Sequence, residues 1–563
     1  MTTVGLVGDG PALEAVRAAL TDTNVTARSV DVASLGATDV SAVVGSVDAE
    51  ALVAASATGR ETDTPLLTVE LGGVGGVPAS GVDAAVSGFA PGTACYECLR
   101  RRVEASEPDT DDGTFDAATA RLAGAVAGRE LVTLVSGGES RVLGGVIELP
   151  HAQRRLLPVP DCSCTGTRDR KLRRSHEPRS LEAALSAAEV AFDDRIGPVA
   201  SLGELESFPV PYYLATLSST PFSDADVPEY AAGVAADWDP AFMKALGEAL
   251  ERYSAAVYRT ASLPRTHPNP VDPARFVRPD DDVPSVEMWY PSESLATGES
   301  VGLPAELVVF PPPERRIRPA ITTGLGLGNG GCEALLSGLY EVVERDAAML
   351  AWYSTYDPLG LEVDDEGYET LVRRLRAERL EATALLLTQD IDVPVVAVCI
   401  HRDGEWPRFA AGMSADLDPD AAARGALEEA IQNWLELRRM GRERAGDESG
   451  AIGRYADFPD AARAFVDPKT TVPASTVGPE PTPDGEDELD ALVSRVTDGG
   501  LEPYGARLTP PDVESLGFEA VRVVVPEAQP LFTDQAYFGG RARSVPEALG
   551  FSPRLDRDHH PFP

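Results

Sequence analysis

The stretch Thr322–Trp352, TTGLGLGNGGCEALLSGLYEVVERDAAMLAW, is the part of the sequence that most constrains the fold. It opens with closely spaced glycines and continues with apolar residues three or four positions apart, the pattern of a helix with one buried face. Glu341, Glu344 and Arg345 share one side of that helix, because residues three and four apart are neighbours on a helix surface. Glycines let a ligand approach the backbone, a helix N-terminus attracts anions, and paired carboxylates suit Mg²⁺. The stretch therefore predicts a site for Mg²⁺ and phosphate, although a capped surface helix with an acidic side has the same pattern.

Two other segments repeat this arrangement of acids on a helix. They are AFMKALGEALERYS (241–254) and AAARGALEEAIQNW (421–434). The polar residues that they place on one side are Glu248, Glu251 and Arg252 in the first segment and Glu428 and Gln432, with Glu429 between them, in the second. Carboxylates pooled from three helices repel one another and raise each other's pKa values unless cations neutralise them. We therefore predict bound Mg²⁺ and nucleotide phosphates between the three helices.

The three segments together resemble the ATP-binding motifs of the YcaO family, whose members use ATP to activate backbone amides. The resemblance covers about residues 180–563. It is supported by the stretches FAAGMSADLDPDAAARGALEEAIQ (409–432), VRVVVPEAQP (521–530) and PFP (561–563). Two positions differ from the residues usual in the family: Lys244 replaces a hydroxyl residue, and Glu436 replaces an arginine.

This resemblance implies an ATP- and Mg²⁺-dependent cyclodehydratase. A Cys, Ser or Thr side chain of a ribosomally made precursor peptide would attack the preceding amide carbon, as in bacteriocin-like biosynthesis. ATP would phosphorylate the amide oxygen, and phosphate would leave with that oxygen to give a thiazoline or an oxazoline. The implied Mg²⁺ ligands are Glu248, Glu251, Glu341, Glu344 and Glu428. The implied ATP-binding residues are these glutamates with Arg252, Asn329, Arg345 and Gln432.

A role in catalysis is predicted for Arg252, Arg345 and Pro563. The arginines would hold phosphate or orient the glutamates. In the enzymes that this sequence resembles, a proline-rich terminus reaches the ATP site, and Pro561 and Pro563 fit a stiff, extended tail. A frayed terminus is the alternative interpretation.

Two other functions remain open from the sequence. A YcaO domain can also make thioamides, in which external sulfide replaces the internal nucleophile. A non-catalytic scaffold of a modification pathway is the second alternative, and the unusual Lys244 and Glu436 favour it. We prefer cyclodehydration because the N-terminal half of the chain, which is fused to these motifs, carries a predicted zinc site.

The composition excludes several classes of protein. The chain has 563 residues and a formal net charge of −41, and its only lysines are Lys171, Lys244 and Lys469. An acidic surface poor in lysine indicates a halophilic organism, which we take to be an archaeon. Such a charge repels nucleic acid. The N-terminus has no signal-peptide pattern, and no apolar run approaches the ~20 residues that span a bilayer, so we expect a cytoplasmic protein.

The N-terminal half predicts an alternating α/β domain. Residues 4–20, VGLVGDGPALEAVRAAL, are typical of a strand, a glycine turn and a helix, and further strands are expected at 25–32 and 42–47. The turn is similar to a nucleotide-binding turn but out of its usual register. We favour a Rossmann-like scaffold over a working nucleotide site there.

Four cysteines in two close pairs suggest a metal site. They are Cys95 and Cys98 in PGTACYECL, and Cys162 and Cys164 in PDCSCTG. Two thiolate pairs fit a tetrahedral structural Zn²⁺ site, while a redox dithiol and unrelated buried cysteines are the alternatives. Cys332 and Cys399 are expected in the core. A nucleophilic pair of Cys399 with His401 is a less favoured alternative.

The cysteine pairs ahead of a YcaO-like half resemble the E1-like partner protein of azoline-forming cyclodehydratases. That resemblance covers about residues 1–165 and implies a Rossmann-like fold with a zinc held by four thiolates. The family binds the precursor peptide through a small winged-helix element, and we expect none here because the sequence opens on a Rossmann-like strand. A separate leader-binding protein or an azoline oxidase is therefore a possible partner, and a homodimer is the family-level expectation.

These observations predict the organisation of the whole chain. Residues 1–165 form the E1-like domain, residues 166–179 a basic linker, and residues 180–563 an α+β YcaO domain with an acidic insertion at 441–488. The linker is either a tether or a contact for an acidic peptide. Within the second domain we expect mostly helix at 364–387 and a buried strand at 393–400.

Overall fold

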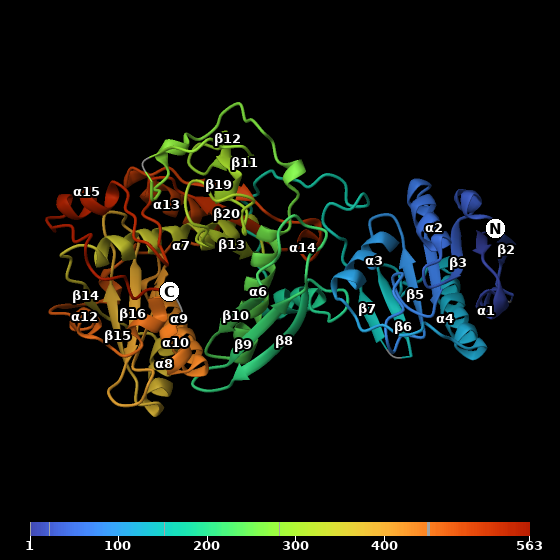
Figure 1. Cartoon of the computed structure of the whole chain (residues 1–563), viewed down its shortest axis with the longest axis horizontal. Coiled ribbons are helices and arrows are strands. Elements are labelled where there is room, and N and C mark those ends of the chain that lie inside the picture. Colours follow the sequence, from blue (N-terminus) through green and yellow to red (C-terminus); the bar gives the residue numbers. More distant parts are fainter. Residues whose placement is uncertain (1, 22, 151, 281, 448–450) are drawn as a thin grey trace.

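The computed structural model describes residues 2–21, 23–150, 152–280, 282–447 and 451–563. It places the N-terminal residues in a smaller region beside a much larger C-terminal region, and an extended linker runs from one to the other (Figure 1). No helix among the described residues is both long enough and apolar enough to cross a membrane.

The N-terminal region is built on a seven-stranded sheet of order β2-β1-β3-β4-β5-β6-β7. Its strands are β1 (Thr2–Val7), β2 (Val25–Ser29), β3 (Val40–Ser46), β4 (Leu66–Leu71), β5 (Ala84–Phe89), β6 (Gly145–Leu149) and β7 (Ala152–Arg155). The first four strands pair in parallel and the last three are antiparallel, which confirms the predicted alternating α/β pattern for the first part only.

Four helices accompany this sheet: α1 (Gly10–Leu20), α2 (Glu50–Glu61), α3 (Tyr96–Ala105) and α4 (Ala117–Val135). Helices α1 and α4 cross so closely that a Cβ atom at Gly124 would lie 2.0 Å from the carbonyl oxygen of Ala12. A buried ion pair ties the region to the rest of the chain: Arg102 on α3 lies 2.6 Å from Asp512, which also accepts a hydrogen bond from Tyr253.

The linker at 166–179 lies along the C-terminal region, and its arginines bind that region. Arg174 donates to the carbonyl oxygens of Ser294 and Leu295, and Arg179 donates to those of Leu516 and Gly517. Arg173 pairs with Glu519 at 2.9 Å. These partners support the interpretation of the linker as a tether, because its charge is already used inside the chain.

The C-terminal region contains three sheets, of order β10-β9-β8, β12-β11-β19-β20-β13 and β17-β16-β15-β14-β18. Their strands are β8 (Val199–Glu206), β9 (Tyr212–Leu217), β10 (Tyr230–Val234), β11 (Trp289–Ser294), β12 (Ser300–Pro304), β13 (Leu325–Gly328), β14 (Leu359–Glu362), β15 (Glu381–Leu386), β16 (Val395–His401), β17 (Phe409–Ala415), β18 (Thr471–Pro473), β19 (Tyr504–Arg507) and β20 (Glu519–Val524). The helices are α5 (Leu181–Ala188), α6 (Trp238–Ala256), α7 (Gly331–Trp352), α8 (Glu366–Ala377), α9 (Pro419–Met440), α10 (Arg442–Asp447), α11 (Ala451–Tyr455), α12 (Asp460–Phe465), α13 (Gly485–Asp498), α14 (Pro511–Ser515) and α15 (Arg541–Ala548).

Helix α7 is central to this region because both five-stranded sheets pack against it. Alternate strand residues point to opposite faces, so Val395 and Ala397 of β16 share a core with α7, whereas Val396 and Val398 share a core with α9. Trp352, at the end of α7, is fully buried. This arrangement explains why α7 is apolar on most sides, with Glu341 and Glu344 on one side and the buried Asp346 paired with Arg541 on another.

Two predicted segments differ in the structure. Residues 364–387 form α8 and then strand β15, because the segment EATALL at 381–386 pairs with β16. The segment 441–488 does not simply stand apart as an insertion, because β18 pairs in parallel with β14 and extends the sheet. Residues 448–450 lie outside the described part of that segment.

Candidate active site

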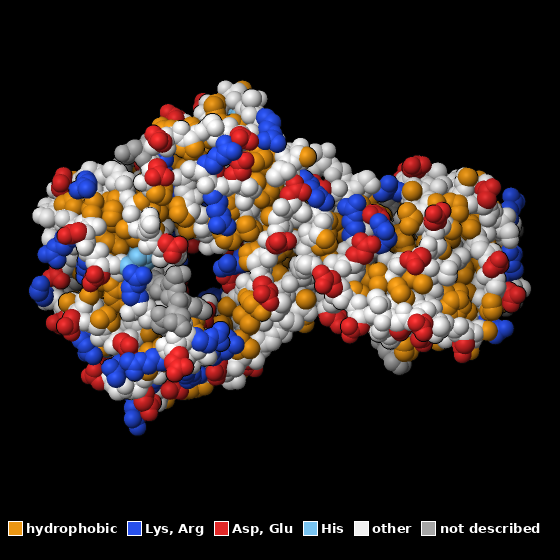
Figure 2. All heavy atoms as spheres, in the orientation of Figure 1, with side chains coloured by type: hydrophobic (Ala, Val, Ile, Leu, Met, Phe, Trp, Pro, Cys, Tyr) orange, Lys and Arg blue, Asp and Glu red, His pale blue; other side chains and the backbone are white. Residues whose placement is uncertain are grey.

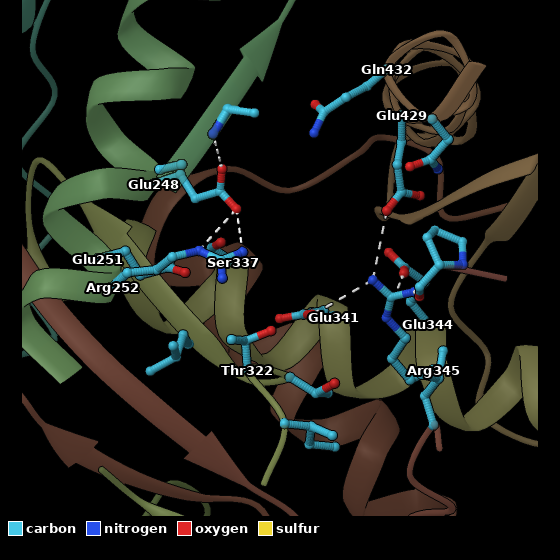
Figure 3. A pocket seen from close by; sticks show the side chains of 18 of the residues that line it. Glu248, Glu251, Arg252, Thr322, Ser337, Glu341, Glu344, Arg345, Glu429 and Gln432 are labelled. Carbon is cyan, nitrogen blue, oxygen red and sulfur yellow. Dashed lines mark hydrogen bonds and ion pairs between the residues drawn. The ribbon is translucent and has the colours of Figure 1, made fainter. Parts of the chain in front are cut away.

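Helices α6, α7 and α9 line one cavity of about 950 Å³, and each contributes acidic side chains to it (Figure 3). The acids that line this cavity are Glu248, Glu251, Glu341, Glu344, Glu429 and Glu436. The main prediction from the sequence, that three distant helices bring their acids together, agrees with this placement.

Helix α6 supplies Glu248, Glu251 and Arg252. The Glu248 carboxylate accepts a hydrogen bond of 2.6 Å from the backbone N–H of Ala232 on β10 and pairs with Arg252 one turn away. Burial, helped by the charges of Glu341 and Glu248, raises the pKa of Glu251 to about 8. A carboxyl with that pKa holds its proton at neutral pH until a cation replaces the proton.

Helix α7 supplies the arginine at the centre of the cavity wall. The Arg345 guanidinium lies 3.7 Å from Glu341, 3.3 Å from Glu344 and 3.6 Å from Glu429. Glu341 is also fixed by the backbone N–H of Gly324, which donates to it at 2.9 Å. Burial raises the pKa of Glu344 to about 8 despite the nearby arginine. One cation therefore faces three carboxylates, and further positive charge would be needed to neutralise all three.

Helix α9 points Glu429 into the cavity, where the sequence had predicted Glu428. Glu429 accepts a hydrogen bond from the backbone N–H of Met413, and burial raises its pKa. Glu428 instead pairs with Lys244 of α6 and is not among the residues that line the cavity. Both acids lie within one helical turn of Gln432, so the spacing alone did not distinguish them.

Glu436 also lies in this cavity, although the sequence presented it only as a departure from a family pattern. Its carboxylate accepts hydrogen bonds from Gln432 at 3.2 Å and from the Tyr212 hydroxyl at 3.4 Å. Burial raises its pKa. The signal in the sequence was its position four residues after Gln432, on the same helix face.

A second cavity, of about 310 Å³, adjoins the first and shares Glu248, Glu251 and Ser337 with it. Asn329 and Glu333 line this second cavity, at the start of α7. The Asn329 amide donates to Glu333 at 3.0 Å, while its buried Oδ1 atom has no hydrogen-bond partner among the described residues. Asn329 thus lies outside the large cavity that holds the carboxylates, in the smaller cavity that adjoins it.

The end of the chain reaches the first cavity. The backbone oxygen of Pro563 accepts a hydrogen bond of 2.8 Å from Arg345, and Pro563 lines the cavity. Phe562 is fully buried and packs edge-on against Trp352 at 6.2 Å between ring centroids. The final residues are therefore packed into the core rather than frayed.

Comparison with known proteins identifies this architecture. The family model described as YcaO cyclodehydratase, ATP- and Mg²⁺-binding, matches residues 232–529, which include all three acidic helices. The chain belongs to the YcaO family.

Several relatives of this YcaO protein are known. It is 28% identical over 381 residues to an uncharacterized protein of Methanothermobacter thermautotrophicus, a match that covers 63% of this chain and 96% of the relative. The structure of YcaO from Methanopyrus kandleri bound with AMPPCP and Mg²⁺ is 25% identical, covers 63% of this chain and 93% of that one, and superposes with a TM-score of 0.51. A heterocyclase in complex with substrate and cofactor is 20% identical, with a TM-score of 0.73 over 98% of this chain and 83% of that one. The last similarity shows that the fold is shared, including the N-terminal region.

The four cysteines of the N-terminal region of this YcaO protein do come together. Their sulfur atoms are 3.8 Å apart for Cys95 and Cys98, 3.6 Å for Cys95 and Cys162, and 3.4 Å for Cys98 and Cys164. Four sulfurs around a tetrahedral Zn²⁺ at about 2.3 Å would be separated by about 3.8 Å. The four thiols therefore have the spacing and the donor type that a zinc ion requires.

Among the described residues, this is the one group in which three or more Cys, His or carboxylate ligand atoms lie within 4.8 Å of one another. The glutamates of the large cavity are more widely spaced. They do not form a ready-made cage for a single ion, and they fit instead a ligand that brings oxygen atoms of its own.

The remaining cysteines are buried, as the sequence predicted. His401 lies on the same strand as Cys399, but its Nε2 atom is 3.0 Å from the Thr383 hydroxyl and its ring stacks on Phe458. These contacts support a structural role for His401.

Proposed function

We propose that this YcaO protein uses ATP and Mg²⁺ to activate backbone amides of a peptide and to close Cys, Ser or Thr side chains into azoline rings. The observation that carries the proposal is the convergence of acids from α6, α7 and α9 with Arg252 and Arg345 on one cavity. An amide oxygen is a poor leaving group, and transfer of a phosphoryl group to it makes it a good one. A site for such transfer needs positioning and charge neutralisation more than it needs a nucleophile of its own.

The cavity residues fit Mg²⁺ and a nucleotide. The Oε1 atom of Glu344 is buried and accepts no hydrogen bond from the described residues, although the Arg345 Nε atom lies 3.3 Å away. Glu251, Glu344 and Glu429 all have raised pKa values because they are buried together without enough positive charge. Hard oxygen donors in excess of cations suit Mg²⁺, which commonly bridges carboxylates and phosphates. The free Oδ1 atom of Asn329 in the adjoining cavity is an acceptor for the amino group of a purine.

The chain's own residues would then divide the work. Glu248, Glu251, Glu341, Glu344 and Glu429 would hold Mg²⁺, with Gln432 beside them. Arg345 would orient three of these carboxylates and hold the Pro563 end of the chain against the cavity. Tyr212, Leu214 and Tyr230, which also line the cavity, offer apolar and aromatic surface for the peptide.

The N-terminal region completes the proposal. We assign residues 1–165 to an E1-like domain whose four cysteines hold a structural Zn²⁺, residues 166–179 to a linker and residues 180–563 to the YcaO domain. The contacts of Arg102 and Tyr253 with Asp512 support a fixed placement of the first part on the second. A homodimer and a separate leader-binding protein or oxidase also belong to this proposal.

The test is ATP turnover with Mg²⁺, with and without a peptide that contains Cys, Ser and Thr. Glu344→Gln should abolish the peptide-stimulated turnover, and Glu366→Gln, which changes an exposed acid on α8, should not. A product lighter by one water supports cyclodehydration. Turnover that needs added sulfide and exchanges oxygen for sulfur would indicate thioamidation instead, and failure of ATP to bind with Mg²⁺ present would leave only the scaffold.

A further inference from the structure

A group of arginines lies on the surface where α8, α9 and α10 end or begin. We call it the arginine patch, and it consists of Arg379, Arg438, Arg439, Arg442 and Arg444. Figure 2 shows basic side chains gathered below the central opening, over the area that α8 and α10 occupy in Figure 1. Arg438 joins the helices, because it lies 3.8 Å from Glu378 at the end of α8 and 3.2 Å from Glu206 at the end of β8. The chain as a whole, by contrast, has a formal net charge of −41.

Part of this charge is not neutralised within the chain. Arg438 has two acidic partners and Arg442 pairs with Asp457 at 3.1 Å. Arg379, Arg439 and Arg444 are exposed, and none of them forms an ion pair with the residues that the structure describes. This contrasts with the linker, whose arginines are bound to the C-terminal region. Apart from Arg439, whose charge also acts on the buried Glu436, these exposed arginines keep their positive charge available to a ligand.

Helix ends explain only some of these arginines. Cations near a helix C-terminus are favourable, which accounts for Arg438 and Arg439 in the last turn of α9. Arg442 is instead the first residue of α10, where the positive end of the helix disfavours a cation. The pair with Asp457 offsets this cost at Arg442, and Arg444 lies in the last turn of α10, where a cation is favourable.

The patch continues the face of α9 that lines the large cavity. Glu429, Gln432 and Glu436 point into the cavity, and Arg439 follows three residues after Glu436 on the same side. The Arg439 guanidinium lies 5.7 Å from the ring of Tyr212, which itself lines the cavity. The charge along this one helix face changes from acidic, inside, to basic at the surface.

We propose that the arginine patch binds an acidic segment of the peptide substrate next to the residue that is modified. This inference rests on the proposed function, because it assumes that a peptide enters the large cavity. The apolar side chain of Phe208 is 44% exposed, and its carbonyl oxygen accepts a hydrogen bond from Arg438, so the surface also offers apolar contact to a peptide. A long nucleic acid fits less well, because the rest of the acidic surface repels its phosphates.

The test uses three labelled peptides of equal length, each with one Cys beside a tract of Glu, Gln or Lys. Binding is measured by fluorescence anisotropy across a series of KCl concentrations. We expect the Glu peptide to bind at least about fivefold more tightly than the Gln peptide at low salt, and the difference to shrink as salt screens the charges. The variant Arg439→Glu/Arg444→Glu should reverse the preference and favour the Lys peptide. Arg543→Glu makes the same substitution at an exposed position on α15 and should leave the preference for the Glu peptide unchanged.

Each outcome either supports or overturns the binding of an acidic peptide by the arginine patch. Equal binding of the three peptides, or a preference that the double variant does not reverse, overturns the patch. Equal binding of an oligo-dT with the same sensitivity to the variant would make nucleic acid the ligand and also overturn it. If the Glu peptide binds as expected but no peptide is ever turned over, the patch stands and the proposed function fails. If peptides are turned over without regard to charge, the function stands and the patch fails.

Discussion

The ammonium group of Lys244 on α6 pairs with the carboxylate of Glu428 on α9. These two helices line different walls of the large cavity. Lysine is rare in this chain, and this one occupies the helix position one turn before Glu248. The pair shows that a protein cation already holds one of the acids predicted to bind Mg²⁺. Lys244 also lines the smaller cavity, together with Asn329.

Removal of this ammonium group should make the site more dependent on Mg²⁺. In Lys244→Met the pair is lost, and because the lysine is half exposed the stability without Mg²⁺ should fall by no more than about 1 kcal/mol. The carboxylates then have one less positive neighbour, so added Mg²⁺ should raise the midpoint of thermal unfolding by more than in the wild type. Lys469→Met removes the exposed pair with Asp357 and is the matched control. An equal Mg²⁺ effect in wild type and Lys244→Met would contradict the prediction.

The neighbouring acids of α9 should differ sharply in function. Glu429 lies in the cavity, 3.6 Å from Arg345, whereas Glu428 is engaged by Lys244. Glu429→Gln should lower Mg²⁺-dependent ATP turnover at least about tenfold, a loss of ~1.4 kcal/mol of transition-state stabilisation. Glu428→Gln should retain most of the turnover. The two variants differ by one position and carry the same chemical change, so a larger effect at Glu428 would reject the assignment of the site.

Glu428 and Glu429 also show how much of the site could be predicted from the sequence alone. The spacing of Glu248 with Glu251, and of Glu341 with Glu344, fixed the helix faces because the surrounding apolar residues left one acidic side. In α9 both Glu428 and Glu429 were adjacent to that side, and only the packing against β17, where the Met413 N–H binds Glu429, separates them. The contact between Arg345 and Pro563 follows from no local pattern, and only the family resemblance placed the end of the chain at the ATP site. Periodicity predicts faces, whereas contacts between distant segments depend on the assembled fold.

The raised pKa values predict how stability depends on pH. Glu251 and Glu344 each have a pKa of about 8 in the folded chain, against about 4.3 when unfolded. Between these values the folded state binds more protons than the unfolded state. Without Mg²⁺, the free energy of unfolding should therefore decrease as pH rises from about 4.5 to about 8. Urea unfolding across this range checks the slope, and Glu344→Gln should make it shallower.

The same protons should be released when Mg²⁺ and ATP bind. Ligation requires the ionised carboxylates, so binding at pH 7 should release protons and binding at pH 9 should release far fewer. Calorimetry in buffers with different heats of ionisation counts them. A proton release that does not change between pH 7 and pH 9 would show that these carboxyls do not contact the ligand.

The cysteine cluster should hold one zinc per chain. Cys98 is fully buried and accepts a hydrogen bond of 3.2 Å from the backbone N–H of Val159, as expected of a thiolate ligand. Cys98→Ser should lose the zinc, measured by elemental analysis, and should lower the midpoint of thermal unfolding. Cys332→Ser places the same hydroxyl in another buried position and should keep the zinc. Retention of zinc by the Cys98 variant would argue for a different site.

Arg345 should be the residue whose loss disturbs the cavity most. It is the cation nearest to Glu341, Glu344 and Glu429, and breaking a buried pair from one side costs about 3–5 kcal/mol because the remaining charge has no partner. Arg345→Met should thus lower the free energy of unfolding by about that amount at pH 9, where Glu344 is ionised, and by less at pH 6, where Glu344 can hold a proton. The double variant Arg345→Met/Glu344→Gln should recover part of the loss, since it removes one of the uncompensated charges.

Arg345→Lys should recover stability but not turnover, because an ammonium group supplies the charge without the planar fork that reaches the carboxylates and Pro563 together. Full activity in Arg345→Lys would show that charge alone suffices at this position and that the contact with Pro563 has no part in the reaction.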